Sequence, residues 1–445
     1  MKSRILTCTM ATIVFALATA PTRLLGQAIG NDSKHLHYSV QVLEGIGGTA
    51  SRANSINDQG WVTGWSELYG DTAQHATLWR NGVLTDLGTL GGLNSQVEFP
   101  DKNKRGIVLG GAEISASDPF AENFCNFGSN LICLPFMWRN GVMTPLPTLG
   151  GNNGYATDLN DRGQAVGFAE TATNDPNCIT PQVFDFEAVM WELKSGEVQE
   201  LPHFPGDRIA AALAINEKGQ AVGGSGVCES PLASFNASLH AVLWPHGPNG
   251  EVIDLGTFGG VMSNLAFYIN SKGQVVGISD LPGDATGHAF LWENGVLTDL
   301  GTLPGDFYSV AYGINDNSQV VGQSCDVNFN CRAFLWQDGV MMDLNSLIPA
   351  SSGLYLVDPA DINSRGEIAG QGYDPVTGNS PAFLALPCHE KHPVAEDCGT
   401  EAAAATRGLG ESYERPKVIL PPKLREQLHQ QRRFGAFGAT RVRSQ

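Results

Sequence analysis

A pattern of four short apolar runs recurs along this chain and limits the folds open to it more than any other feature. Its clearest copy, residues 288–324, reads HAFLWENGVLTDLGTLPGDFYSVAYGINDNSQVVGQS. The runs have the length of β-strands. Asn294-Gly295 between the first two suits a type I′ hairpin turn, and Asn315 begins a four-residue turn between the last two. One unit is therefore predicted to be two hairpins, or four antiparallel strands.

The number of copies of the turn in the second hairpin gives the number of units. Elsewhere it reads Asn-x-x-Gly, and with Ser318 replacing the glycine in one copy it begins at seven asparagines: Asn57, Asn103, Asn160, Asn216, Asn270, Asn315 and Asn363. A small apolar strand ending in glycine follows each turn. A strand ending in tryptophan comes next in six units, at Trp79, Trp138, Trp191, Trp244, Trp292 and Trp336, and residues 381–386 are its degenerate seventh copy.

The two ends of the repeat region complement each other. The strand that follows each tryptophan strand is missing after residues 381–386, and its counterpart, YSVQVLEGIGG, begins at Tyr38. A linear stack would leave two incomplete sheets with open edges, whereas a ring brings the fragments together. Four-stranded units of roughly 45 to 57 residues are the size of propeller blades. We predict an all-β, seven-bladed β-propeller over residues 38–386, with four antiparallel strands per blade and the N-terminal strand closing the last blade.

Side-chain size predicts the strand order within a blade. Blades crowd at the axis, so the small strands after the turn loops should be inner and the bulky tryptophan strands outer. Ala289-Phe-Leu-Trp is apolar throughout, as expected for a strand covered on both faces. The tryptophans are therefore predicted to pack between blades rather than to stack on a ligand.

These motifs, HAFLW, DLGTLGG and IN-x-x-GQVVG-x-S, resemble the HAF family of bacterial extracellular repeat proteins over some 350 residues. The resemblance implies a secreted protein and brings no assigned chemistry. The second and last units depart from the pattern, because residues 96–105 lack Ile-Asn and residues 381–386 lack tryptophan.

Segments outside the repeats predict export. Residues 1–28 have Lys2 and Arg4 before an apolar stretch and small residues, the layout of a secretory signal peptide, with cleavage after Ala20 or Ala28. We expect an extracellular or periplasmic protein with no membrane insertion after cleavage. Residues 387–445 are predicted to be a mostly disordered tail with a possible short basic helix at 424–434, either a tether or docking peptide or a solvated end.

The cysteines are consistent with an oxidising compartment. Without Cys8 of the leader, eight remain, an even number. Those before the tail fall between a Gly-ended strand and a tryptophan strand, so they should share one face of the ring. Proximity suggests pairing of neighbours and one bridge between blades: Cys125 with Cys133, Cys325 with Cys331, Cys388 with Cys398, and Cys178 with Cys228. The spacing does not fit a zinc site.

Charge and motifs exclude several function classes. Between leader and tail, 14 Lys and Arg face 38 Asp and Glu, a net charge of about −24 that repels nucleic acid and anionic lipid. The sequence contains no Gly-x-Ser-x-Gly, phosphate-loop, His-Glu-x-x-His or Ca²⁺-loop motif. We therefore expect no cofactor and no metal site. Three histidines share one repeat position, which favours a structural role for them: His75, His240 and His288.

The loops that lead into the inner strands should ring the central mouth of the propeller. They contain few titratable groups, and the candidate ligand contacts there are Tyr155, Asp207, Asp306, Phe307 and Tyr308. This composition suits hydrogen bonding and stacking better than proton transfer. We expect a monomeric, non-enzymatic binding or scaffolding module for a peptide, protein or neutral glycan. The alternative is a polysaccharide-acting enzyme, a glycosidase or lyase, or a lectin.

Overall fold

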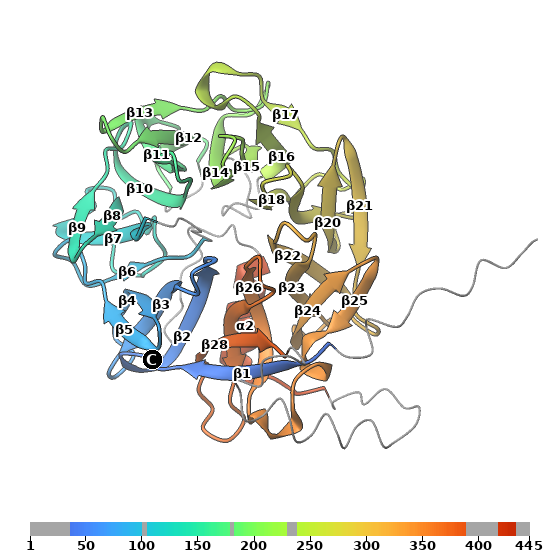
Figure 1. Ribbon diagram of the computed structural model, residues 1–445. Coiled ribbons are helices and arrows are strands. Elements are labelled where there is room, and N and C mark those ends of the chain that lie inside the picture. Colours follow the sequence, from blue (N-terminus) through green and yellow to red (C-terminus); the bar gives the residue numbers. More distant parts are fainter. Residues whose placement is uncertain (1–35, 100–104, 179–181, 229–237, 389–416, 433–445) are drawn as a thin grey trace, which may run out of the picture. The chain divides into compact units, whose positions relative to one another are not determined.

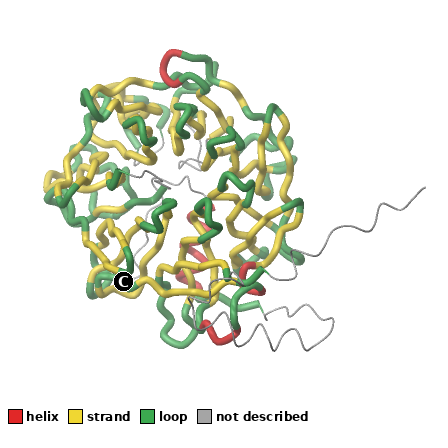
Figure 2. Tube along the Cα trace, in the orientation of Figure 1, coloured by secondary structure: helices red, strands yellow, loops and turns green. Residues whose placement is uncertain are grey.

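The computed structural model describes residues 36–99, 105–178, 182–228, 238–388 and 417–432. Residues 38–388 form seven four-stranded antiparallel sheets arranged in a ring, the predicted seven-bladed β-propeller (Figure 1). Strands and loops make up nearly all of this ring (Figure 2). The predicted signal peptide and the bridge partner Cys398 lie outside the described residues.

In the first six blades, the first strand along the chain is innermost and the fourth is outermost. The last blade takes its outermost strand from the N-terminus. The first three blades comprise β2 (Gly47–Ile56), β3 (Val62–Leu68), β4 (Gln74–Arg80) and β5 (Val83–Asp86); β6 (Ser95–Gln96), β7 (Ile107–Ser117), β8 (Leu131–Arg139) and β9 (Val142–Pro145); and β10 (Gly150–Leu159), β11 (Gln164–Asn174), β12 (Phe184–Glu192) and β13 (Glu197–Glu200).

The fourth to sixth blades comprise β14 (Ile209–Ile215), β15 (Ala221–Gly226), β16 (Ser238–Trp244) and β17 (Ile253–Asp254); β18 (Asn264–Ile269), β19 (Val275–Asp280), β20 (Gly287–Glu293) and β21 (Val296–Gly301); and β22 (Tyr308–Ile314), β23 (Val320–Cys325), β24 (Cys331–Gln337) and β25 (Val340–Asp343). The seventh contains β26 (Tyr355–Ile362), β27 (Ile368–Tyr373) and β28 (Ala382–Pro387). Short 3₁₀ turns are η3 (Gly247–Asn249), η4 (Leu344–Ser346) and η5 (Ala350–Ser352), and one α-helix, α2 (Pro422–Arg432), follows the ring.

The seventh blade is closed by the N-terminal strand. Strand β1 (Tyr38–Leu43) pairs antiparallel with β28, Tyr38 opposite Pro387 and Leu43 opposite Ala382, which gives the sheet order β1-β28-β27-β26. The backbone N–H of Tyr38 also donates to the carbonyl of Leu347 at 2.8 Å. The predicted split blade is therefore confirmed, and the edge that β28 would otherwise expose is paired.

Turn chemistry explains the hairpins. Asn294 and Gly295 have φ of 52° and 83°, as a type I′ turn requires. In the second hairpin of the sixth blade, Asn315 Oδ1 accepts hydrogen bonds from the N–H groups of Asn317 and Gln319, both at 3.0 Å. The asparagine side chain thus holds the turn from inside.

The same asparagines also join neighbouring blades. Each side-chain Nδ2 donates to the backbone carbonyl of the corresponding asparagine in the next blade, at 2.9–3.2 Å, in the pairs Asn160 to Asn216, Asn216 to Asn270, Asn270 to Asn315, Asn315 to Asn363, and Asn363 to Asn57. We call this series the asparagine girdle. Each buried side-chain amide of the girdle holds its own turn through Oδ1 and contacts the next blade through Nδ2. Its polar atoms are therefore hydrogen-bonded, as buried polar groups require.

The sequence pattern places a glycine at the end of each second strand, but the strand continues past it in the structure, and close packing requires the glycine there. A Cβ at Gly322 would lie 2.0 Å from the carbonyl oxygen of Val310 and 2.8 Å from Phe334 Cζ. The inner strand has a register shift at this point, between Ala311 and Gly313, which brings its backbone onto the glycine.

The tryptophans pack between blades, as predicted. Trp191 and Trp244 are buried, and each indole N–H donates to a backbone carbonyl of the preceding blade, of Pro147 at 2.8 Å and of Pro202 at 2.7 Å. Such a contact fixes both the ring plane and the spacing of blades.

Three of the predicted disulfides are present: Cys125–Cys133, Cys178–Cys228 and Cys325–Cys331. Cys388 is disulfide-bonded as well. Disulfides are typical of oxidising compartments. Among the residues that the structure describes, no helix is long and apolar enough to cross a membrane.

Candidate functional site at the disulfide-bearing face

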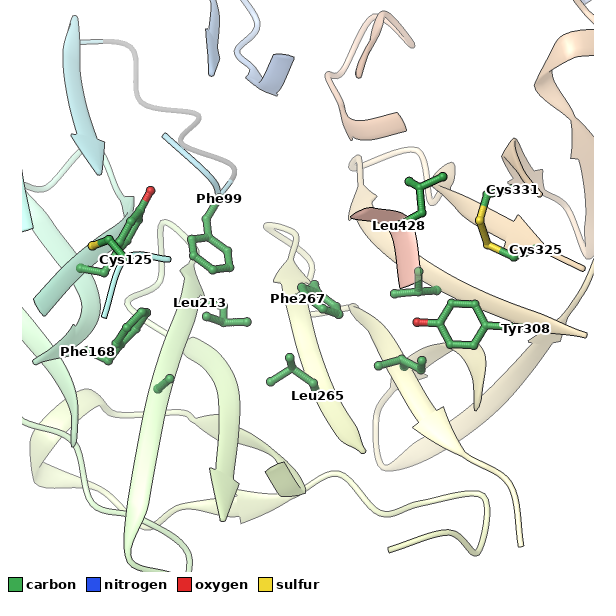
Figure 3. Packing of buried hydrophobic residues seen from close by; sticks show 14 of the residues in the cluster. Phe99, Cys125, Phe168, Leu213, Leu265, Phe267, Tyr308, Cys325, Cys331 and Leu428 are labelled. Carbon is green, nitrogen blue, oxygen red and sulfur yellow. A yellow bond between two sulfur atoms is a disulfide. The ribbon is translucent and has the colours of Figure 1, made fainter. Parts of the chain in front are cut away.

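A continuous apolar cluster gathers at the face of the ring that carries the disulfides. We call it the mouth cluster; it includes Phe99, Phe124, Tyr155, Phe168, Phe186, Leu213, Leu265, Phe267, Tyr308, Val310, Tyr355, Val357, five of the disulfide cysteines, and Leu420, Leu424 and Leu428 from the tail. Figure 3 shows Leu428 beside Tyr308 and the Cys325–Cys331 bridge. The tail therefore contributes part of the mouth's core.

Three leucines attach the tail segment, residues 417–432, to the propeller. Leu420, Leu424 and Leu428 are 1%, 5% and 0% exposed. Their spacing of four residues places Leu424 and Leu428 on one face of α2 and directs Leu420, just before the helix, to the same side. Complete burial of a leucine side chain is worth about 1.5–3 kcal/mol. The leucine row thus provides most of the attraction between tail and propeller.

Polar contacts fix the register of the tail. The backbone N–H of Leu420 donates to Asn330 Oδ1 at 3.0 Å. Lys417 Nζ lies 2.7 Å from Asp306 Oδ1 and 3.1 Å from Asp326 Oδ2. Burial acts to raise the pKa of Asp326. Hydrogen bonds from Asn330 and Lys417 outweigh this effect and hold the pKa below its ordinary value. The propeller thus presents two carboxylates to one lysine of the tail.

The loop between β23 and β24 receives the helix. Asp326 Oδ1 accepts hydrogen bonds from the N–H groups of Asn328 and Asn330, and the Cys325–Cys331 bridge closes the loop. Phe329, at φ 58°, stacks at a tilt on His429 of α2 with ring centroids 4.3 Å apart. A non-glycine residue rarely adopts this backbone region. The loop is therefore held in an unusual shape that displays Phe329 to the tail.

Two of the predicted contact residues belong to this docking site. Asp306 is bound by Arg332, whose Nη2 lies 2.9 Å from Asp306 Oδ2, and by Lys417, and its side chain is fully buried. Tyr308 is 2% exposed within the mouth cluster. Asp306 contacts the tail and Tyr308 packs within the mouth cluster beside it, so at these two positions the predicted contact residues face protein.

The other three predicted contacts do not join them. Tyr155 is fully buried and donates its hydroxyl proton to the carbonyl of Gln96 at 2.9 Å, so it offers a ligand nothing. Asp207 is buried and pairs with His240 at 2.9 Å. Phe307 alone is open, at 37% exposure. The exposure of these residues could not be predicted from sequence position, because burial depends on side chains from neighbouring blades.

Several docking residues were missed in the sequence. Asn330, Asp326 and Phe329 come from a loop whose role depends on its disulfide-bonded shape. The leucine row of the tail was a usable signal, since the residues recur every four positions from Leu420. The helix predicted at 424–434 is α2, Pro422–Arg432, and it is docked on the propeller.

A second group of charged side chains lies where the inner strands meet at the axis of the ring. Arg52 Nη1 lies 2.6 Å from Glu98 Oε1, and its Nη2 lies 2.8 Å from Asp358 Oδ2. Trp65 Nε1 donates to the other oxygen of Glu98 at 3.2 Å. Burial raises the pKa of both carboxyls, against the opposing effect of Arg52. The two acids thus share one cation and join three blades electrostatically.

Further carboxyls are buried between the second and third blades. Asn153 Nδ2 lies 3.1 Å from both Asp118 Oδ2 and Glu170 Oε2. Burial, with the neighbouring carboxyls, raises the pKa of Glu122 to about 7 and that of Glu170 to about 8. Glu122 accepts hydrogen bonds from the N–H groups of Val183 and Phe184. These acids fasten loops of two blades together.

No protein-family model matches the chain, and no curated protein matches it. Among solved structures, it is similar to a gluconolactonase from Xanthomonas campestris (TM-score 0.35, 10% identity, 82% of this chain and 99% of that one). It is also similar to a prolyl endopeptidase (0.42, 9%, 81% and 52%) and a puromycin hydrolase (0.39, 15%, 77% and 54%). The chain spans about half the length of these last two.

Proposed function

We propose that this chain is a secreted, non-enzymatic propeller of the HAF type that binds peptide segments of partner proteins at the mouth cluster. The observation that supports it best is the docked tail. A separate segment of chain, joined through residues 389–416, occupies the mouth with three buried leucines, a lysine between two carboxylates and a backbone hydrogen bond. A surface that holds one such segment is suited to others of the same chemistry.

The partner segment that fits is basic and amphipathic. Asp306 and Asp326 supply negative charge at one end of the docking site, and the mouth cluster supplies the apolar surface. The net negative charge of the ring would steer a cationic segment toward it. Secretion is supported by the disulfides and by the leader-like residues 1–28.

The alternative is a polysaccharide-acting enzyme. The observation that favours it is the group of Arg52, Glu98 and Asp358 at the axis of the ring. Glu98 and Asp358 both contact Arg52, so two carboxyls are gathered at the axis, and a glycosidase also works with a pair of carboxyls. However, Asp358 is fully buried and both acids are ion-paired, whereas an acid and base catalyst needs access to substrate. Turnover of a polysaccharide that is lost in Asp358→Asn would favour this alternative.

A peptide array tests the proposal. The full chain carrying Leu424→Asp and Leu428→Asp should release its tail, because two carboxylates cannot be buried in the mouth cluster without a large cost. We expect this variant to bind array peptides that combine a basic residue with leucines four apart, and the unmodified chain to bind them weakly. An array in which the released variant binds no peptide, or binds only glycans on a parallel glycan array, would contradict the proposal.

A further inference from the structure

Four of the five residues between Cys325 and Cys331 contact the tail. Asp326 Oδ2 lies 3.1 Å from Lys417 Nζ, the carbonyl of Asn328 accepts a hydrogen bond from Arg425 Nη1 at 3.4 Å, Phe329 stacks on His429, and Asn330 Oδ1 accepts the N–H of Leu420 at 3.0 Å. The fifth, Val327, is exposed. We call residues 326–330 the receptor loop. A disulfide bridge therefore encloses the residues that receive the tail.

The bridge lies at the base of the receptor loop. Cys325 ends β23, Cys331 begins β24, and the two residues lie opposite each other in the strand register. Above the bridge, the loop is held by hydrogen bonds to Asp326, whose carbonyl accepts the N–H of Phe329 at 2.9 Å and whose Oδ1 accepts that of Asn330 at 3.0 Å. The covalent link and these bonds together fix the path of the loop.

The backbone of Phe329 makes the loop's shape dependent on this support. Its φ of 58° lies in a region that residues other than glycine rarely adopt. Such a conformation persists only where the surrounding structure imposes it. A loop without its bridge can relax toward ordinary φ values, and the ring of Phe329 then leaves His429. We therefore expect a reduced loop to hold the tail less tightly.

The docked tail in turn shields the bridge. Cys325 and Cys331 are fully buried, and Leu428 lies beside their bridge (Figure 3). A thiolate can attack a disulfide only where it reaches a sulfur atom. Release of the tail removes the apolar cover that its leucines give to this side of the mouth cluster. Docking of the tail and closure of the bridge should therefore favour each other.

We propose that the Cys325–Cys331 bridge is a redox latch for the tail, which a dithiol opens by reducing the bridge. One thiolate of the dithiol attacks a bridge sulfur and forms a mixed disulfide, and the other cysteine leaves as a thiolate that takes up a proton. The second thiol of the dithiol then displaces the remaining cysteine. Two electrons pass to the bridge, which becomes two thiols, and the dithiol becomes a disulfide. The latch rests on the docked tail, and its role in partner binding rests on the proposed function.

Reduction of the full chain tests the latch, because linkage makes the coupling reciprocal. The unmodified chain and the variant with Leu424→Asp and Leu428→Asp would be equilibrated with dithiothreitol at several ratios of reduced to oxidised reagent. Alkylation with mass spectrometry would count free thiols at Cys325 and Cys331. We expect the bridge of the variant to open at a ratio about 10-fold lower, within the usual range of coupling between sites.

The Cys125–Cys133 bridge is the internal control in the same samples. Figure 3 places Cys125 across the mouth from Leu428, so its bridge should be reduced to the same extent in both chains. Equal reduction of the Cys325–Cys331 bridge with the tail docked and with the tail released would overturn the latch. This measurement keeps every cysteine, so it does not depend on the folding of a cysteine variant.

Binding of a labelled peptide of residues 417–432 measures the reverse effect. Addition of Cys325→Ala and Cys331→Ala to the tail-released chain should weaken binding about 10-fold. Val327→Ala in the same background changes an exposed side chain of the receptor loop and keeps the bridge, so affinity should stay within about 2-fold. Equal affinity with and without the bridge would contradict the latch. If the peptide fails to bind even with the bridge intact, the proposed function fails, and the reduction experiment decides on the latch.

Discussion

Asn363 Nδ2 donates a hydrogen bond to the backbone carbonyl of Asn57 at 3.1 Å, across 306 positions of sequence, where the last blade meets the first. The same bond joins other neighbouring blades, so the asparagine girdle continues across the junction of the ring. An asparagine that the sequence marks as a turn residue therefore also sets the contact between blades.

Replacing a girdle asparagine should destabilise the ring. Asn315→Ala removes the bonds to Asn363 and Gln319 and the acceptor that holds its own turn. We expect a loss of about 1–3 kcal/mol in the free energy of unfolding, because buried partners stay unsatisfied. Asn317→Ala in the same turn removes an exposed bond and should change stability by less than about 0.5 kcal/mol. Denaturant unfolding of both variants measures the difference, and equal stabilities would count against the girdle.

Removal of the N-terminal strand should open the ring. A mature chain that lacks residues 38–44 would leave β28 without its partner β1. An unpaired edge invites association with other chains, so we expect a lower melting temperature and a smaller monomer fraction in size-exclusion chromatography. If both quantities stay at their values for the mature chain, the split blade does not contribute to closure.

Stability should fall as the pH rises from about 5 to about 9. Burial raises the pKa of Glu122 to about 7, of Glu170 to about 8 and of Glu187 to about 9, above the 4.5 of a free glutamate. A raised pKa means that the folded state binds the proton more tightly. Its stabilising contribution is complete below about pH 4.5 and is lost as the pH passes through the folded value.

Unfolding free energies at several pH values would measure this slope. Glu187→Gln should reduce it, because an amide keeps the neutral form at every pH. A slope that is flat or reversed between about pH 5 and 9 would show that these carboxyls are ionised in the folded protein.

The fourth bridge can be mapped directly. Cys388 is disulfide-bonded, and the sequence predicts Cys398 as its partner. Non-reducing proteolysis with mass spectrometry of the protein purified without reductant should recover a Cys388–Cys398 peptide. A free thiol at Cys398 would contradict the predicted pairing.

The repeat made most of the architecture predictable, because asparagine turns, Gly-ended strands and tryptophan strands are local patterns with fixed period. The split last blade was predictable because the fourth strand is missing after residues 381–386 and its counterpart begins at Tyr38. The mouth was harder to predict: whether Tyr155 is exposed depends on packing against Phe99 and Phe168, which come from different blades. A docking peptide was one of the roles expected for the tail, but its docking site was not predictable, because Leu420, Leu424 and Leu428 acquire their role only where the Asn328–Asn330 loop meets them.

The central claim, that the mouth is a peptide-binding surface covered by the tail, is tested most directly by binding of a labelled peptide of residues 417–432. Fluorescence anisotropy would follow its titration with the full chain carrying Leu424→Asp and Leu428→Asp. A tethered tail competes at an effective concentration of about 1 mM, so the unmodified chain should bind the peptide at least about 10-fold more weakly.

A peptide with Lys417 replaced by alanine should bind more weakly, since it lacks the contact with Asp306 and Asp326. A peptide with both Leu424 and Leu428 replaced by aspartate is the negative control. The account predicts saturable binding to the tail-released chain with a dissociation constant below about 100 μM. Binding no stronger than that of the aspartate peptide would contradict it.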